Sequence, residues 1–114
     1  MAASAAFLDF LKEQMAGLGA LSVRRMFGGA GVFSEGLMFA LVVDDVLFLK
    51  ADDTTKPAFE SEGLEPFTYG AKGGKRTVMS YWRAPARCLD DPDEMVSWGR
   101  KAQNAARRAS QKKR

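Results

Sequence analysis

The sequence contains no histidine and only one cysteine, and both facts limit the kinds of catalytic and metal site that it can form. Without histidine, the chain lacks the commonest general base, the Ser-His-Asp and Cys-His nucleophile systems, and the usual ligand of zinc and iron. Cys88 has no second cysteine with which to form an internal disulfide or a metal site. We therefore expect Cys88 to be a buried structural thiol, and we predict no metal, no cofactor, no small-molecule substrate and no enzymatic activity.

Long apolar runs are also missing. No stretch of 18 apolar residues is present, and no charged segment followed by an apolar one resembles a secretory signal. We therefore expect a cytoplasmic protein without a membrane partner. The 114 residues suit one domain, and the 46% of hydrophobic residues suffice to build its core.

The net charge of +3 conceals an uneven distribution of charge. Residues 100–114 hold seven of the 17 basic residues and none of the 14 acidic ones, so the first 99 residues have 10 basic and 14 acidic residues. The tail thus carries +7 and the body −4. A basic tail indicates either an anionic partner such as nucleic acid or simply a solvated helix end.

Residues 24–50 predict an antiparallel meander of strands. Two pairs of turn residues, Glu35-Gly36 and Asp44-Asp45, separate apolar runs, and such pairs tolerate the positive φ angles of hairpin turns. The run 37–43 is apolar throughout, which favours a central strand, because a strand with one wet face would alternate.

A glycine cluster, Gly28-Gly29-Ala30-Gly31, follows a predicted first strand at 23–27. Glycine loops that cradle phosphate open a helix, whereas this cluster runs into another strand, so we reject a nucleotide site. The glycines favour instead a bulge, a tight turn or a close approach of two backbones.

Helices are predicted before, between and after the strands. Ser4 caps the first helix, and a short helix follows residues 52–55 and closes at Gly63. Asp91-Pro92-Asp93-Glu94 predicts the start of the last helix, with a cap, a first-turn proline and a capping-box glutamate. The same acidic cluster could be a magnesium or general-acid site, but capping and the helix dipole explain it.

A second hairpin is predicted from strands at 64–69 and 77–83. Its loop is basic and glycine-rich, and together with Tyr69, Tyr81 and Trp82 nearby it would suit nucleic-acid binding. Hairpin tips are also polar simply because they are solvated, and this alternative stays open.

These elements predict an α+β fold of two layers. An antiparallel meander sheet of about five to six strands would be packed against N-terminal, middle and C-terminal helices. We place the domain at residues 1–106 and expect residues 107–114 to form a basic tail that is frayed or disordered.

Several separated segments resemble the TfoX (Sxy) N-terminal domain family. In order, they are Arg24-Arg25-Met26-Phe27-Gly28-Gly29, Leu37-Met38-Phe39-Ala40-Leu41, Leu47-Phe48-Leu49-Lys50-Ala51-Asp52, Gly63-Leu64-Glu65-Pro66-Phe67-Thr68-Tyr69 and Met79-Ser80-Tyr81-Trp82. The resemblance implies a bacterial two-layer α+β domain. It also implies a role in regulating competence and transcription, as in two-domain members that carry a second, helical module. In this sequence we expect only a short basic tail in place of that module.

Two hypotheses follow for the function. The first is a TfoX-like regulatory module that performs no catalysis and binds DNA or a protein of the transcription machinery. The alternative is a self-associating interaction domain, a homodimer without a nucleic-acid role, that uses a strand edge or an aromatic patch including Trp82 or Trp98. The predicted binding residues are all basic: Arg24, Arg25, Lys72, Lys75, Arg76, Arg107, Arg108, Lys112, Lys113 and Arg114.

Overall fold

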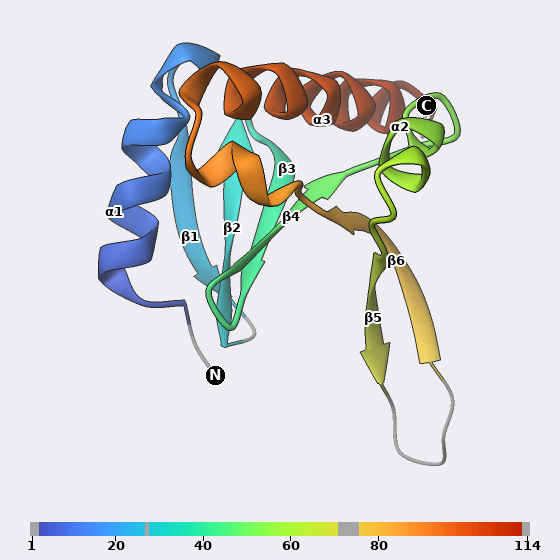
Figure 1. The fold of residues 1–114 in the computed structure, drawn as a ribbon, viewed down its shortest axis with the longest axis horizontal. Coiled ribbons are helices and arrows are strands. Elements are labelled where there is room, and N and C mark those ends of the chain that lie inside the picture. The colour runs from blue at the N-terminus through green and yellow to red at the C-terminus, as the bar shows by residue number, and fades with distance from the viewer. Residues whose placement is uncertain (1–2, 27, 71–75, 113–114) are drawn as a thin grey trace.

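The computed structural model describes residues 3–26, 28–70 and 76–112, and these form an open antiparallel sheet with helices packed against it (Figure 1). The six strands lie in the order β1-β2-β3-β4-β6-β5. Their bounds are β1 Ser22–Met26, β2 Gly29–Ser34, β3 Leu37–Val43, β4 Val46–Lys50, β5 Pro66–Gly70 and β6 Arg76–Arg83. The helices are α1 Ala5–Gln14, α2 Lys56–Ser61 and α3 Pro92–Lys112, with 3-10 turns η1 Ala16–Leu18 and η2 Ala86–Leu89. The predicted α+β class is confirmed.

The two predicted turns of the meander have the backbone conformation that their residues favour. The φ angles are 53° at Glu35 and 79° at Gly36, and 55° at Asp44 and 58° at Asp45. Positive φ at both central residues matches the right-handed twist of the flanking strands. Strand β3, which these turns bound, lies inside the sheet between β2 and β4, as its continuous apolar run predicted.

The glycine cluster forms a turn and a close approach of two strands. Gly28 has a φ of 76°, which suits glycine. At Gly29 a Cβ atom would collide with the backbone oxygen of Val42 in β3. Two of the alternatives left open by the sequence, a tight turn and close backbone approach, are therefore both realised here.

A β-bulge in β3 directs an additional aromatic ring into the core. Val32 pairs with Ala40 and Phe33 pairs with Met38, so Phe39 has no partner residue in β2. Both Phe39 and Ala40 are fully buried. An extra residue of this kind turns two successive side chains away from strict alternation, so that both pack inward.

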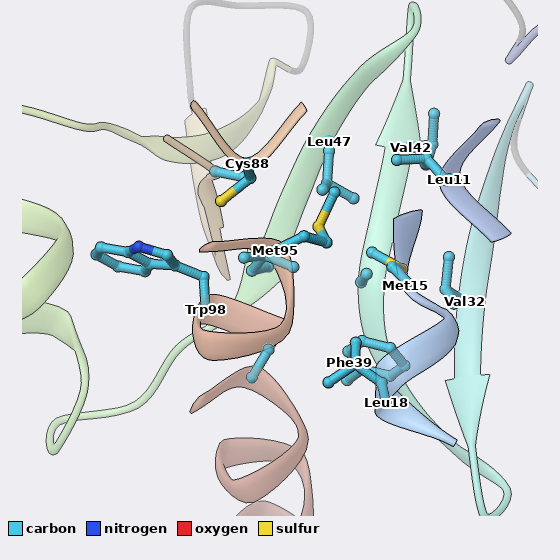
Figure 2. Packing of buried hydrophobic residues seen from close by; sticks show 14 of the residues in the cluster. Leu11, Met15, Leu18, Val32, Phe39, Val42, Leu47, Cys88, Met95 and Trp98 are labelled. Carbon is cyan, nitrogen blue, oxygen red and sulfur yellow. The ribbon is translucent and has the colours of Figure 1, made fainter. Parts of the chain in front are cut away.

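The helices and one face of the sheet enclose the core (Figure 2). Each helix contributes buried side chains to the same cluster, for example Leu11 from α1, Phe59 from α2 and Met95 from α3. Cys88 lies there with no exposed surface, which confirms a buried thiol. The strand residues in this cluster are Ala30, Val32, Phe39, Ala40, Val42, Leu47, Leu49 and Trp82.

Two helix starts agree with the sequence, one of them only in part. The hydroxyl oxygen of Ser4 accepts a hydrogen bond from the Phe7 N–H at 3.1 Å, as predicted. Asp91 likewise accepts from the Asp93 N–H at 2.9 Å. The expected capping-box role of Glu94 is wrong, because its carboxylate accepts instead from Arg87 at 2.9 Å, a charge-assisted bond that is stronger than a neutral one.

Helix α3 continues through Lys112, beyond the domain boundary that we placed at residue 106. Its buried residues Ala102 and Ala106 belong to the core. The frayed tail at 107–114 stays a prediction. Across the stretches that the structure covers, none of the helices has both the length and the apolar character required to cross a bilayer.

Candidate interaction surface

The sheet has a second face, which points away from the helix-covered core. Successive side chains of a strand point to opposite faces, so residues that alternate with the core positions lie on this second face. Leu41 and Tyr81 are buried, with 8% and 6% of their surface exposed, yet neither belongs to the core cluster under the helices. We call this second side of the sheet the open face.

One row of paired residues crosses the open face from strand to strand. The row runs perpendicular to the strands and crosses five of them, so its ends lie roughly 19 Å apart at about 4.8 Å per strand. An arginine stands at each end, and small or apolar residues lie between. In order, the paired residues are Arg24, Gly31, Leu41, Phe48 and Arg83.

Gly31 makes room within this row for methionine side chains. A Cβ atom at Gly31 would lie 2.5 Å from the Met38 sulfur and 3.2 Å from the terminal methyl carbon of Met26. The space above the glycine is thus filled by flexible thioethers, which adapt to irregular partners. The half-buried apolar side chains of the open face are Met26, Phe33, Met38, Val43, Val46, Phe48 and Phe67.

Cations surround and partly cover these apolar side chains. The guanidinium carbon of Arg24 lies 5.6 Å from the centre of the Phe33 ring, and the Lys50 ammonium lies 5.1 Å from that of Tyr81. Arg83 is exposed. None of the six strands contains an aspartate or glutamate. The row is therefore apolar in the middle and carries an arginine at each end.

Tyr81 is held in the neutral form on this face. Burial raises the pKa of the Tyr81 hydroxyl to about 12. Its hydroxyl donates a hydrogen bond to the backbone oxygen of Met38 at 3.3 Å. The ring is therefore a structural support between β6 and β3, and its hydroxyl does not act as a base near neutral pH.

The two adjacent arginines of β1 point to opposite faces, because successive side chains of a strand alternate. Arg24 lies on the open face, whereas Arg25 donates a hydrogen bond to the backbone oxygen of Ala3 at 2.7 Å. Arg25 thus holds the segment that precedes α1, while Arg24 remains exposed to a partner.

The basic residues near the end of α3 differ in their surroundings. Arg107 is exposed and donates to the Asn104 side chain at 3.0 Å. Arg108 makes a two-pronged bond to Asp52, with distances of 2.6 and 3.1 Å. This bond from Arg108 holds the pKa of the Asp52 carboxyl below its usual value and raises that of the arginine. Arg108 is therefore engaged within the fold.

Six of the predicted binding residues have no described side chain. The backbone of Arg76 begins β6, and that of Lys112 ends α3. The other four, Lys72, Lys75, Lys113 and Arg114, lie outside the described residues. A binding role for any of the ten basic residues stays a prediction.

The predicted aromatic patch around Trp82 or Trp98 is wrong. Their exposed fractions are only 8% and 6%, and their ring centres lie 6.0 and 5.0 Å from that of Phe59. Both indoles complete the core between α2, α3 and β6. Neither Trp82 nor Tyr81 is exposed enough for a base to stack on it, so the stacking surface that we considered near the second hairpin loses these two rings.

No catalytic arrangement emerges from the described side chains. Burial raises the pKa of the Cys88 thiol to about 11, so it is not a nucleophile near neutral pH. Within residues 3–26, 28–70 and 76–112, no group of three or more acidic or cysteine side chains could hold a metal ion. The acidic residues at the start of α3 instead cap the helix and bind Arg87.

Sequence reasoning missed three residues of the row that crosses the open face. Leu41, Phe48 and Arg83 were interpreted only as strand residues. The signal that could have found them is the alternation Val46-Leu47-Phe48-Leu49-Lys50, in which positions 47 and 49 face the core and position 48 faces away. Because Leu47 and Leu49 on one face and Val46 and Phe48 on the other are all apolar, this alternation does not show as a change of polarity in the sequence.

Comparison with known proteins identifies the family. The model of the TfoX N-terminal domain matches residues 13–106, which is most of the chain. The chain belongs to the TfoX N-terminal domain family. A relative is the DNA transformation protein TfoX1 of Aliivibrio fischeri, 38% identical over 72 residues, which are 63% of this chain and 32% of that protein. The matched part of this TfoX N-terminal domain thus spans about a third of the relative's length.

Proposed function

We propose that this TfoX N-terminal domain is a regulatory module of bacterial competence that acts by binding a macromolecular partner and performs no catalysis. The relative named as a DNA transformation protein supports the assignment to bacterial competence. The observation that supports partner binding is the open face. Its apolar side chains are not covered by the helices and lie between two arginines. A sheet face of this kind is stabilised when another layer packs on it.

The described side chains offer few groups suited to reaction, which supports a role without catalysis. Cys88 and Tyr81 both have pKa values raised by burial, to about 11 and about 12. The hollow at the end of α3 gathers Lys50 and Arg108, but Arg108 is bound to Asp52 and Lys50 donates to Ser80 at 2.7 Å. These charges are satisfied within the fold instead of being directed at a substrate.

The proposal is tested by substituting Phe48 in the bacterium that encodes the chain. Phe48→Ser removes an apolar side chain from the centre of the open face but leaves the helix-covered core intact. We expect transformation frequency and transcription of DNA-uptake genes to fall toward the level of a deletion strain. Lys12→Glu, on the exposed side of α1, is the matched control and should leave both unchanged.

Phe48→Ser must also accumulate and unfold at nearly the wild-type temperature, which immunoblotting and thermal melts of the purified protein would establish. A stable variant that transforms as well as the wild type would contradict a regulatory role for the open face. Loss of the contact between Phe48 and Phe67, whose ring centres are 5.0 Å apart, should cost about 1 kcal/mol.

Direct contact with DNA is a second candidate, favoured by the exposed Arg107 on α3 and by Arg24. A chain shortened at Gly99 would remove Ala102 and Ala106 from the core, so side-chain substitution is the better test. We would titrate labelled duplex DNA with the wild type and with Arg107→Gln. Affinity that falls steeply with salt and weakens on substitution would favour DNA, because binding to phosphates releases counterions.

A further inference from the structure

We propose that the open face binds an acidic amphipathic helix of another protein. This inference rests on the proposed function, since it names the partner class for the same surface. The occupant would place an apolar stripe over Leu41 and Phe48 and carboxylates near Arg24 and Arg83.

The position of the sheet's backbone hydrogen-bonding groups favours a helix as the occupant of the open face. Backbone N–H and C=O groups of a sheet point within its plane, toward neighbouring strands, so a segment lying on its face finds no backbone partners there. A helix satisfies its own backbone groups and can bury an apolar stripe. The roughly 19 Å between the ends of the row corresponds to about 13 helical residues.

The basic residues of the open face favour a partner with acidic side chains. Arg24 and Arg83 stand at opposite ends of the row, and the strands contain no acidic residue. The guanidinium of Arg24 rests against Phe33 and is therefore held at the edge of the apolar area. Carboxylates form strong, two-pronged hydrogen bonds with arginine, which would fix the orientation of the helix.

The same features disfavour two other occupants. A second copy of the chain would bring arginines against arginines, because the two faces that meet in a symmetric dimer are identical. Single-stranded nucleic acid stacks its bases on exposed aromatic rings. Here Arg24 lies over the Phe33 ring and Lys50 over the Tyr81 ring, and the centre of the row is occupied by Leu41.

The test is a selection of displayed helical peptides of about 18 residues, long enough to cross the row, against the whole chain. We expect the enriched peptides to have apolar residues at i, i+3, i+4 and i+7, with aspartate or glutamate toward both ends. The charge-reversed protein Arg24→Glu/Arg83→Glu should bind such a peptide at least about tenfold more weakly. Lys12→Glu is the control, because it reverses a single charge at an exposed position away from the open face.

A charge swap makes the test decisive. A synthetic peptide in which lysine replaces the enriched carboxylates should bind the charge-reversed protein better than it binds the wild type. Failure of this recovery, or enrichment of peptides without carboxylates, would overturn the proposal. It would also be overturned by a single-stranded oligonucleotide that binds the wild type but not Phe48→Ser, or by a dimer that Phe48→Ser dissociates.

The outcomes separate this inference from the proposed function. If Phe48→Ser abolishes regulation in the cell but the charge swap fails, the regulatory role stands and the acidic helix is refuted. If the charge swap succeeds but Phe48→Ser leaves regulation unchanged, the face binds an acidic helix and its role in regulating competence is refuted.

Discussion

Two glycines of β2, Gly29 and Gly31, show how the absence of a single side chain shapes this sheet. Gly29 allows the Val42 carbonyl to approach β2, whereas Gly31 leaves a space on the open face that methionines fill. The first contact involves rigid backbone, and the second involves flexible thioethers. A methyl group should therefore be tolerated far less well at Gly29 than at Gly31.

Gly29→Ala should lower the free energy of unfolding by about 2–3 kcal/mol, because its methyl group would force β2 and β3 apart. Urea unfolding of the purified protein would measure the loss. Gly36→Asn is the control, since the turn there is open and asparagine tolerates a positive φ, so a change within about 0.5 kcal/mol is expected. Equal stability of Gly29→Ala and the wild type would contradict the close approach.

Residues whose role is local were predictable from the sequence, whereas residues whose role depends on packing were not. Ser4 and Asp91 cap helices through neighbours two or three positions away, so a short pattern reveals them. Glu94 was misassigned because its partner, Arg87, comes from the turn before the helix. The tryptophans were misassigned because burial depends on which face the helices cover.

Helix α3 is the element that joins most parts of the fold, and it is secured near both ends. Asp91 caps its start, and Arg108 near its end binds Asp52 just before α2. The hairpin turns followed from the sequence because they are encoded in adjacent residues, but the pairing of β4 with β6, which leaves β5 at the edge, did not. The bulge at Phe39 and the cross-sheet row did not, because register becomes apparent only when the strands are paired.

Asp52→Asn should destabilise the protein in a pH-dependent way. The bond from Arg108 lowers the pKa of Asp52 in the folded chain. Its contribution is therefore full above the unfolded value of about 3.9 and is lost as the pH falls through the lower folded value. We expect a loss of about 1 kcal/mol at neutral pH, reduced by the partial hydration of both groups, that shrinks toward zero in strong acid.

Thermal or urea unfolding across the acid range would test this, with Asp53→Asn as the matched control. Asp53 meets Lys56 only at 3.5 Å and its side chain is 94% exposed, so its substitution should change stability by less than about 0.5 kcal/mol. A pH-independent effect of Asp52→Asn would show that the loss of its turn hydrogen bonds, and not of its charge, is responsible.

At the scale of the whole molecule, the sheet has two edges, β1 and β5, and one uncovered face. Edges invite pairing with another chain, which was the basis of the homodimer alternative. Edge β1 carries Arg24 and Arg25 side by side, so antiparallel pairing with a second β1 would bring like charges together.

We therefore expect the purified protein to remain a monomer at physiological salt over the whole soluble concentration range. Sedimentation velocity at several concentrations would measure this. A dimer that forms under these conditions, and that Arg24→Ala strengthens by removing the repulsion, would show that the β1 edge pairs in spite of its charge and would support the homodimer alternative.

The burial of Cys88 makes this chain well suited to site-specific labelling. It is the only cysteine in the sequence, it has no exposed surface, and burial raises its pKa to about 11. Maleimides react with the thiolate, so this side chain should stay unmodified in the folded protein near neutral pH. A cysteine introduced at the exposed Ser22 of β1, at the rim of the open face, would then be the one residue that carries a fluorophore. The emission of this fluorophore would report each docking event on an otherwise unaltered protein.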